Sequence, residues 1–103
     1  MLTLPIKKKW FDMIKSGEKK EEYREIKPYW TKRFANNLPA IIRTDFDVIH
    51  SGWVIFKNGY SSNSPTIKCF VDCYKGYGKG YWGAEPDKLY YVLRILRVEE
   101  NNI

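Results

Sequence analysis

The sequence has only two cysteines and one histidine among its 103 residues, and it lacks any long apolar run. Its longest apolar runs contain four or five residues, whereas a helix that crosses a membrane needs about 20. At the N-terminus a short apolar stretch precedes the lysines, which is the reverse of the order in a signal peptide. We therefore expect a cytosolic protein that does not associate with a membrane.

The scarcity of cysteine and histidine leaves little room for a disulfide or a metal site. Cys69 and Cys73 lie in "TIKCFVDCYKG", whose alternating apolar residues predict a strand. Four residues along a strand span about 13 Å, whereas a disulfide needs Cα atoms within about 7 Å. A zinc site would need further ligands, and His50 is the only histidine. We predict two buried thiols, no metal and no cofactor.

The common phosphate-binding motifs are also missing. The stretch "GKGYWG", residues 78–83, formally matches G-x-G-x-x-G, but a predicted strand follows where a dinucleotide fingerprint needs a helix. The G-K-S/T sequence of a P-loop does not occur. We predict a flexible loop between strands at residues 75–88. Its aromatic residues, Trp82 among them, leave open a role in stacking on a base.

The chain is well supplied with apolar and positively charged residues. Hydrophobic residues make up 44% and aromatic residues 17%, so we predict one core and a single domain, residues 1–103. The net charge is +6, and residues 1–33 contribute +5 of it, with ten Lys or Arg against five Asp or Glu. A one-sided positive field attracts phosphates and other anions, although a merely soluble basic surface has the same composition.

Apolar periodicity predicts five strands and two helical segments. The helix at 7–17 is predicted because Trp10, Phe11 and Ile14 share a helix face and because Gly17 suits a helix C-terminus. The strands are expected at 2–6, 19–26, 47–56, 66–74 and 89–100, and a second short helix at 27–34. Short strands that are apolar on both faces favour an α+β fold, a small β-barrel with one or two flanking helices.

The stretch "SGEKKEEYREIKPYW", residues 16–30, combines many charges with aromatic residues. Within it, Gly17, Lys19, Glu22 and Arg24 spell G-x-K-x-x-E-x-R. On a strand Glu22 and Arg24 point to the same side, and Lys19 can approach them from the turn, which places two cations around one carboxylate. In solvent such a cluster contributes little, whereas in a cleft it holds Arg24 ready for a phosphate, a carbonyl or a base edge. Composition alone favours the solvated interpretation.

The motif, and its place after a strand and a helix and before a small barrel, resembles the ASCH family, a branch of the PUA-like barrels. The resemblance extends over "LTLPIKKKWFDMIKSGEKKEEYREIKPYW", "FKNGYSSNSP" and "WGAEPDKLYYVLRI", which together look like the short stand-alone ASCH proteins of bacteria and their phages. It covers nearly the whole chain. It implies a PUA-like β-barrel with a cleft beside the motif that binds RNA or a nucleotide.

One bacterial branch of that family hydrolyses the N4-acetyl group of acetylcytidine, which raises an enzymatic alternative. Lys19 and Arg24 match a lysine and an arginine of this branch, but Glu22 stands where the branch has its threonine nucleophile. A glutamate would instead activate water as a general base, assisted by a lysine of lowered pKa. For the distant acidic residue of the branch, the candidates in this chain are Asp72 and Glu85.

We therefore predict that RNA or a nucleotide binds in a basic cleft, with Lys19 at its mouth and Arg24 meeting anionic or carbonyl groups. Glu22 would orient Arg24 or accept a hydrogen bond from a base amino group. Further candidate ligand-binding residues are Tyr29 and Trp30, as a stacking face or a hydrophobic anchor, and Asn58, Tyr60 and Trp82. Two alternatives stay open: a hydrolase of modified nucleosides, and a protein-interaction module for an acidic partner.

Overall fold

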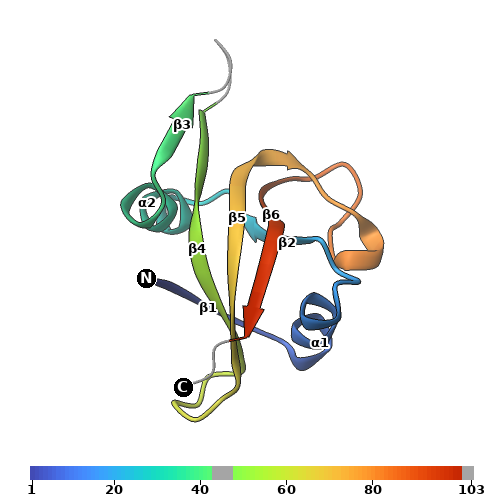
Figure 1. Cartoon of the computed structure of the whole chain (residues 1–103). Coiled ribbons are helices and arrows are strands. Elements are labelled where there is room, and N and C mark those ends of the chain that lie inside the picture. Colours follow the sequence, from blue (N-terminus) through green and yellow to red (C-terminus); the bar gives the residue numbers. More distant parts are fainter. Residues whose placement is uncertain (43–47, 101–103) are drawn as a thin grey trace.

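The computed structural model describes residues 1–42 and 48–100, which form two α-helices and six β-strands (Figure 1). None of the helices in these ranges combines the length and apolarity needed to cross a membrane. In chain order the elements are β1 (Leu2–Ile6), α1 (Lys8–Ser16), β2 (Glu21–Glu25), α2 (Pro28–Asn37), β3 (Ala40–Ile42), β4 (Val48–Asn58), β5 (Thr66–Tyr77), a short 3₁₀-helix (Gly80–Trp82) and β6 (Leu89–Glu100).

The strands form one curled sheet. Its order is β1-β4-β5-β6-β2, with β3 paired to β4 beside this path. β1 runs parallel to β4, and the other pairs are antiparallel. Among the described residues the sheet is a half-barrel with β1 at one edge and β2 at the other (Figure 1). The predicted α+β class, a small barrel-like sheet with flanking helices, is confirmed.

The main core lies between the sheet and the two helices. α1 contributes Phe11 and Ile14, whose spacing of three residues puts them on one helix face, and α2 contributes Phe34. Cys69 and Cys73 of β5 are buried in the same core as free thiols, as predicted. Burial raises the pKa of both thiols to about 12, so neither carries a reactive thiolate at neutral pH.

The turn between α1 and β2 places the charged motif. Gly17 adopts a left-handed conformation with φ of 86°, and its N–H donates to the Ile14 carbonyl at 3.1 Å. The N–H of Lys19 then donates to the Met13 carbonyl at 2.9 Å. These two bonds reverse the chain within a few residues, so β2 begins beside the end of α1. The predicted role of Gly17 at the helix C-terminus is confirmed.

Two strands are longer than their apolar pattern indicates. β5 continues through Tyr77, into the segment predicted as a loop, because Gly76 and Tyr77 still pair with residues of β6. Backbone pairing needs no side chain, so a glycine-rich sequence can hide a strand end. β4 extends to Asn58, while the first residue of the strand predicted at 47–56 lies outside the described residues. β3 was not predicted, since three residues carry too little pattern.

The glycine-rich segment after β5 is a packed loop, which corrects its prediction as flexible. The hydroxyl of Tyr23 accepts a hydrogen bond of 2.9 Å from the N–H of Lys79 and donates one of 2.8 Å to Glu21. Tyr23, Ala84, Tyr90 and Val92 form a second small core beneath this loop. The loop is therefore fixed to the side of β2 opposite to Glu22.

We predict that Gly78→Ala lowers the free energy of unfolding by about 1–3 kcal/mol, the usual cost of overpacking. A Cβ at Gly78 would lie 2.6 Å from atoms of Tyr23 and Ala84. Gly80→Ala is the matched control, since a Cβ there meets nothing within 4 Å. The measurement is urea unfolding of both variants. Equal stability of the two variants would contradict the packed loop.

Candidate functional site

A buried cluster of opposite charges surrounds Glu22. Glu22 Oε1 lies 3.2 Å from Lys19 Nζ, and Oε2 accepts a hydrogen bond of 2.6 Å from Arg24 Nη1. In the sheet Glu22 pairs with Leu93 and Arg24 with Tyr91, both members of the main core, so the two side chains share the core side of β2. The predicted arrangement of two cations around one carboxylate is present.

Arg24 links the two edges of the curled sheet. Its Nη1 also donates to the Tyr23 carbonyl at 2.8 Å, and its Nη2 donates to the Pro5 carbonyl of β1 at 3.1 Å. The guanidinium carbon lies 5.3 Å from the ring centroid of Trp30. Three of the five N–H groups of a guanidinium are thus bonded to acceptors among the described residues, and the side chain is 14% exposed. Arg24 is thus held mainly by contacts with β1 and β2.

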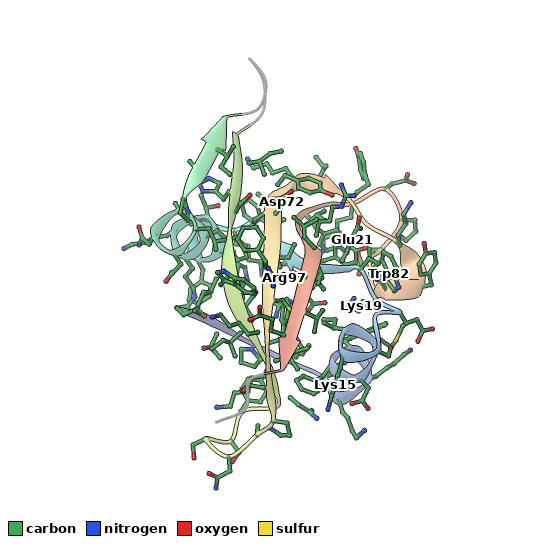
Figure 2. The ribbon with its side chains drawn as sticks, in the orientation of Figure 1. Lys15, Lys19, Glu21, Asp72, Trp82 and Arg97 are labelled. Atoms are coloured by element: carbon green, nitrogen blue, oxygen red, sulfur yellow. The ribbon has the colours of Figure 1, made fainter. Side chains whose placement is uncertain are left out.

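Lys19 is enclosed, which corrects its predicted place at the mouth of the cleft. Its side chain is 0% exposed, and Nζ donates to the Trp82 carbonyl. Nζ also lies 4.4 Å from the ring centroid of Trp10 and 5.2 Å from that of Tyr23. Figure 2 shows Lys19 between α1 and the loop that carries Trp82. The sequence predicted that Lys19 approaches Glu22, but it did not predict that the loop with Trp82 covers the lysine.

The environment of Lys19 lowers its pKa from 10.5. Desolvation by burial is the main cause, the charge and hydrogen bond of Glu22 oppose it, and the charge of Arg24 adds to it. Among the described residues Glu22 is the one carboxylate within an ion-pair distance of Lys19, and the Trp82 carbonyl is its other acceptor. Lys19 is therefore an enclosed ion-pair partner of Glu22, and its ammonium group is not accessible to a ligand.

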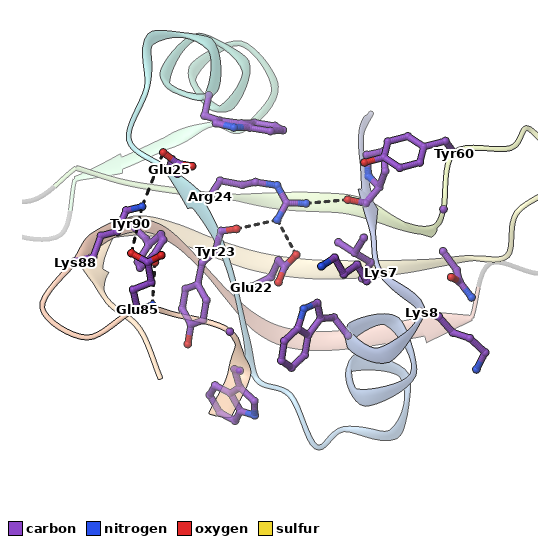
Figure 3. Close-up of a pocket in the computed structure, with 18 residues that line it drawn as sticks. Lys7, Lys8, Glu22, Tyr23, Arg24, Glu25, Tyr60, Glu85, Lys88 and Tyr90 are labelled. Atoms are coloured by element: carbon purple, nitrogen blue, oxygen red, sulfur yellow. Dashed lines mark hydrogen bonds and ion pairs between the residues drawn. The ribbon is translucent and has the colours of Figure 1, made fainter. Parts of the chain in front are cut away.

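A cleft of about 760 Å³ opens beside Glu22 and Arg24 (Figure 3). Its walls come from the end of β1, the start of α1, β2, the first turn of α2, the turn after β4, and the loop before β6. The cleft therefore lies between the two edges of the sheet, β1 and β2, and the Arg24–Pro5 hydrogen bond crosses it at its base.

Most of the candidate residues from the sequence line this cleft. They are Glu22, Arg24, Trp30, Asn58, Tyr60 and Trp82, together with the acidic candidate Glu85. Asp72 does not line it. It is buried between β4 and β5, where its carboxylate accepts a hydrogen bond of 2.5 Å from the Ser51 hydroxyl. Tyr29 does not line it either.

The structure separates the roles of the two aromatic residues at the start of α2. Trp30 stacks on the core residue Phe34 with ring centroids 5.7 Å apart, and Arg24 lies over its ring. It is thus an anchor that also positions Arg24. Tyr29 meets the edge of Trp30 at 4.8 Å and is 60% exposed. The sequence left both roles open for both residues.

Several residues of the cleft were not predicted as site residues. Trp10 was assigned only to the apolar face of its helix, yet it lies at the edge of that face and forms a wall. Its position directly after three lysines could have indicated that Trp10 lies beside a binding site for an anion. Glu25, Lys88 and Tyr90 also line the cleft. Lys88 comes from a distant loop, and no local sequence pattern connects it with β2.

The cleft is less basic than the charge of residues 1–33 suggests. Its lining carries a net formal charge of +1, from four cations and three carboxylates: Lys7, Lys8, Arg24, Lys88, Glu22, Glu25 and Glu85. Figure 3 shows Lys7 and Lys8 at one end, and Glu25, Glu85 and Lys88 at the other. In the described part of the chain, no three His, Cys, Asp or Glu residues are grouped so that they could hold a metal ion.

Comparisons of the chain with protein-family models, with curated proteins and with solved structures give no match. The resemblance to the ASCH family therefore stays a prediction that rests on the G-x-K-x-x-E-x-R motif and on the order of the elements.

We predict that Glu22→Gln lowers the free energy of unfolding by about 3–5 kcal/mol, since it leaves Lys19 and Arg24 without their shared carboxylate in a buried place. Asp12→Asn is the matched control, because Asp12 pairs with Lys8 at 2.5 Å on the surface and such pairs contribute about 0–1 kcal/mol. Chemical denaturation measures both. If Glu22→Gln and Asp12→Asn lowered the free energy of unfolding by similar amounts, the Glu22 cluster would be solvated and the prediction would be wrong.

We also predict a characteristic pH dependence for Lys19. Because the folded-state pKa is lowered, the unfolded chain holds more protons at this site between the lowered pKa and 10.5, and stability from this group rises with pH in that interval. The stability of the wild type relative to Lys19→Met should therefore increase from neutral pH towards 10.5. Lys20→Met, at an exposed position, is the control. A difference that stays constant or falls over this range would contradict the enclosed lysine.

Proposed function

We propose that this chain binds RNA or a nucleotide in the cleft beside Glu22 and Arg24. The observation that carries the proposal is Arg24. Its guanidinium is fixed by three protein acceptors and lines a cleft of about 760 Å³, so the two N–H groups that these bonds do not use can serve a ligand. A planar donor fork held in place suits a phosphate, a carbonyl or a base edge, and the volume is within the usual range of ligand pockets.

The start of α1 supports an anionic group at the Lys7 end of the cleft. The first helical bond begins at the N–H of Phe11, which donates to the Lys7 carbonyl at 3.0 Å, so the preceding N–H groups point out of the helix end. The first turn contains no acidic residue, and Lys7 and Lys8 line the cleft there. Backbone N–H groups and two lysines together favour a phosphate.

The walls of the cleft support a flat, partly apolar group beside that phosphate. Trp10, Trp82 and Tyr60 line it, and each offers an aromatic surface to a base. Glu25 and Glu85 at the other end can accept hydrogen bonds from base amino groups. A cationic end and an opposite end that carries two carboxylates beside Lys88 fit a nucleotide better than they fit a uniformly acidic protein partner.

The geometry gives less support to the hydrolase alternative. Each oxygen of Glu22 already has a cationic partner, Lys19 at one and Arg24 at the other, which is the arrangement of a carboxylate that holds Arg24 in place. Lys19 is enclosed and cannot touch a substrate in this arrangement. The observed contacts suit a residue that positions Arg24 better than they suit a general base.

We expect Arg24→Gln to weaken the binding of nucleoside monophosphates at least about tenfold, since hydrogen bonds to charged groups are worth about 1.5–3 kcal/mol. Arg97→Gln is the matched control, because Arg97 is 69% exposed on β6 and does not line the cleft. Titration calorimetry with the four monophosphates gives the affinities, and circular dichroism establishes that the variants are folded.

A second measurement needs no variant. A ligand held through one or two phosphates should show a log–log salt slope of about −1 between about 50 and 200 mM salt. A steep slope, with Lys7, Lys8 and Lys9 as important as Arg24, would identify a general basic-surface binder. Absence of binding by all four monophosphates, or equal effects of Arg24→Gln and Arg97→Gln, would refute the cleft as the binding site.

A further inference from the structure

Aromatic and cationic side chains continue outward from the cleft along α2. Arg24 lies over Trp30 on the cleft side. The guanidinium carbon of Arg33 is 6.0 Å from the ring centroid of Trp30 and 5.3 Å from that of Tyr29. The Tyr29 and Trp30 centroids are 4.8 Å apart. These contacts form a continuous row, Arg24–Trp30–Arg33–Tyr29, which begins in the cleft and ends on the surface.

Two features of this row are not explained by packing within the chain. Tyr29 is 60% exposed, although it is a large aromatic residue beside a binding cleft. Arg33 Nε is buried and has no hydrogen-bond partner among the described residues. Buried donors in folded proteins are nearly always satisfied, so this one calls for a partner that residues 1–42 and 48–100 do not provide.

The surroundings of the row favour an anionic partner. α2 has the sequence "PYWTKRFANN", which contains Lys32 and Arg33 and no acidic residue. The exposed ring and the unsatisfied guanidinium are neighbours, so one ligand can meet both. A nucleotide combines a base that stacks on an aromatic ring with a phosphate that accepts from arginine, and this combination is typical of sites for single-stranded nucleic acid.

We infer that the ligand is single-stranded RNA of at least two nucleotides: one occupies the cleft, the next stacks its base on Tyr29, and Arg33 contacts the phosphate between them. The inference rests on the proposed function of the cleft. The Tyr29 ring meets the Trp30 ring edge-on, with centroids 4.8 Å apart and planes at 86°, and most of the Tyr29 side chain is exposed, so a base can stack on it.

The test compares adenosine 5′-monophosphate (pA) with the dinucleotide pApA on the whole chain. The wild type should bind pApA between about fivefold and a hundredfold more tightly than pA, the range that stacking on one aromatic ring provides. Tyr29→Ala should bring this ratio close to one, whereas Tyr29→Phe should keep it. Tyr77→Ala is the control, since Tyr77 is also exposed, at 66%, and does not line the cleft.

Salt dependence tests Arg33 separately. In the wild type the log–log salt slope for pApA should be steeper than that for pA by about 0.7, one additional phosphate. Arg33→Gln should remove this increment. Equal binding of pA and pApA, or a ratio that survives Tyr29→Ala, would overturn the inference and leave the cleft as a mononucleotide site. If neither probe binds, the proposed function fails and the inference fails with it.

Discussion

The ion pairs of Glu22 with Lys19 and Arg24 are the constraint on which the rest of the site depends. Each partner of this carboxylate has a second attachment: Lys19 donates to the Trp82 carbonyl in the loop, and Arg24 donates to the Pro5 carbonyl of β1. One carboxylate therefore connects the loop, the edge strand β2 and the first strand of the chain. A buried charge without a partner is strongly destabilising. Loss of any one of these side chains would therefore weaken the contacts of all three segments.

The cleft exists because the sheet does not close between its edges. Direct backbone pairing of β1 with β2 would fill the space between them, whereas the Arg24 side chain spans it with a single hydrogen bond to Pro5 and leaves room beside it. A proline suits such an edge, because it has no N–H to leave unpaired and still offers its carbonyl. The same guanidinium thus joins the two edges and lines the cleft between them.

Local chemistry in the sequence predicted much of this arrangement. Strand parity predicted that Glu22 and Arg24 share one side of β2, and Gly17 marked the end of α1. The predicted five strands and two helices lie near their observed positions. Contacts between distant segments were not predictable in the same way. The covering of Lys19 by Trp82 depends on how a loop from residues 78–88 folds back, and no pattern in either segment encodes that contact. The short β3 lacked enough residues for any pattern.

Stability alone does not account for two buried cations around one buried carboxylate. Apolar side chains of similar volume would often hold such a place equally well or better, because they avoid the cost of desolvating charges. Apolar residues would not provide a guanidinium that is fixed in orientation by three hydrogen bonds to protein acceptors and that lines a cleft. On this argument Lys19 and Glu22 are positioning residues for Arg24. The enclosure of Lys19 then supports the proposal, because a positioning residue has to be held by the protein and need not meet the ligand.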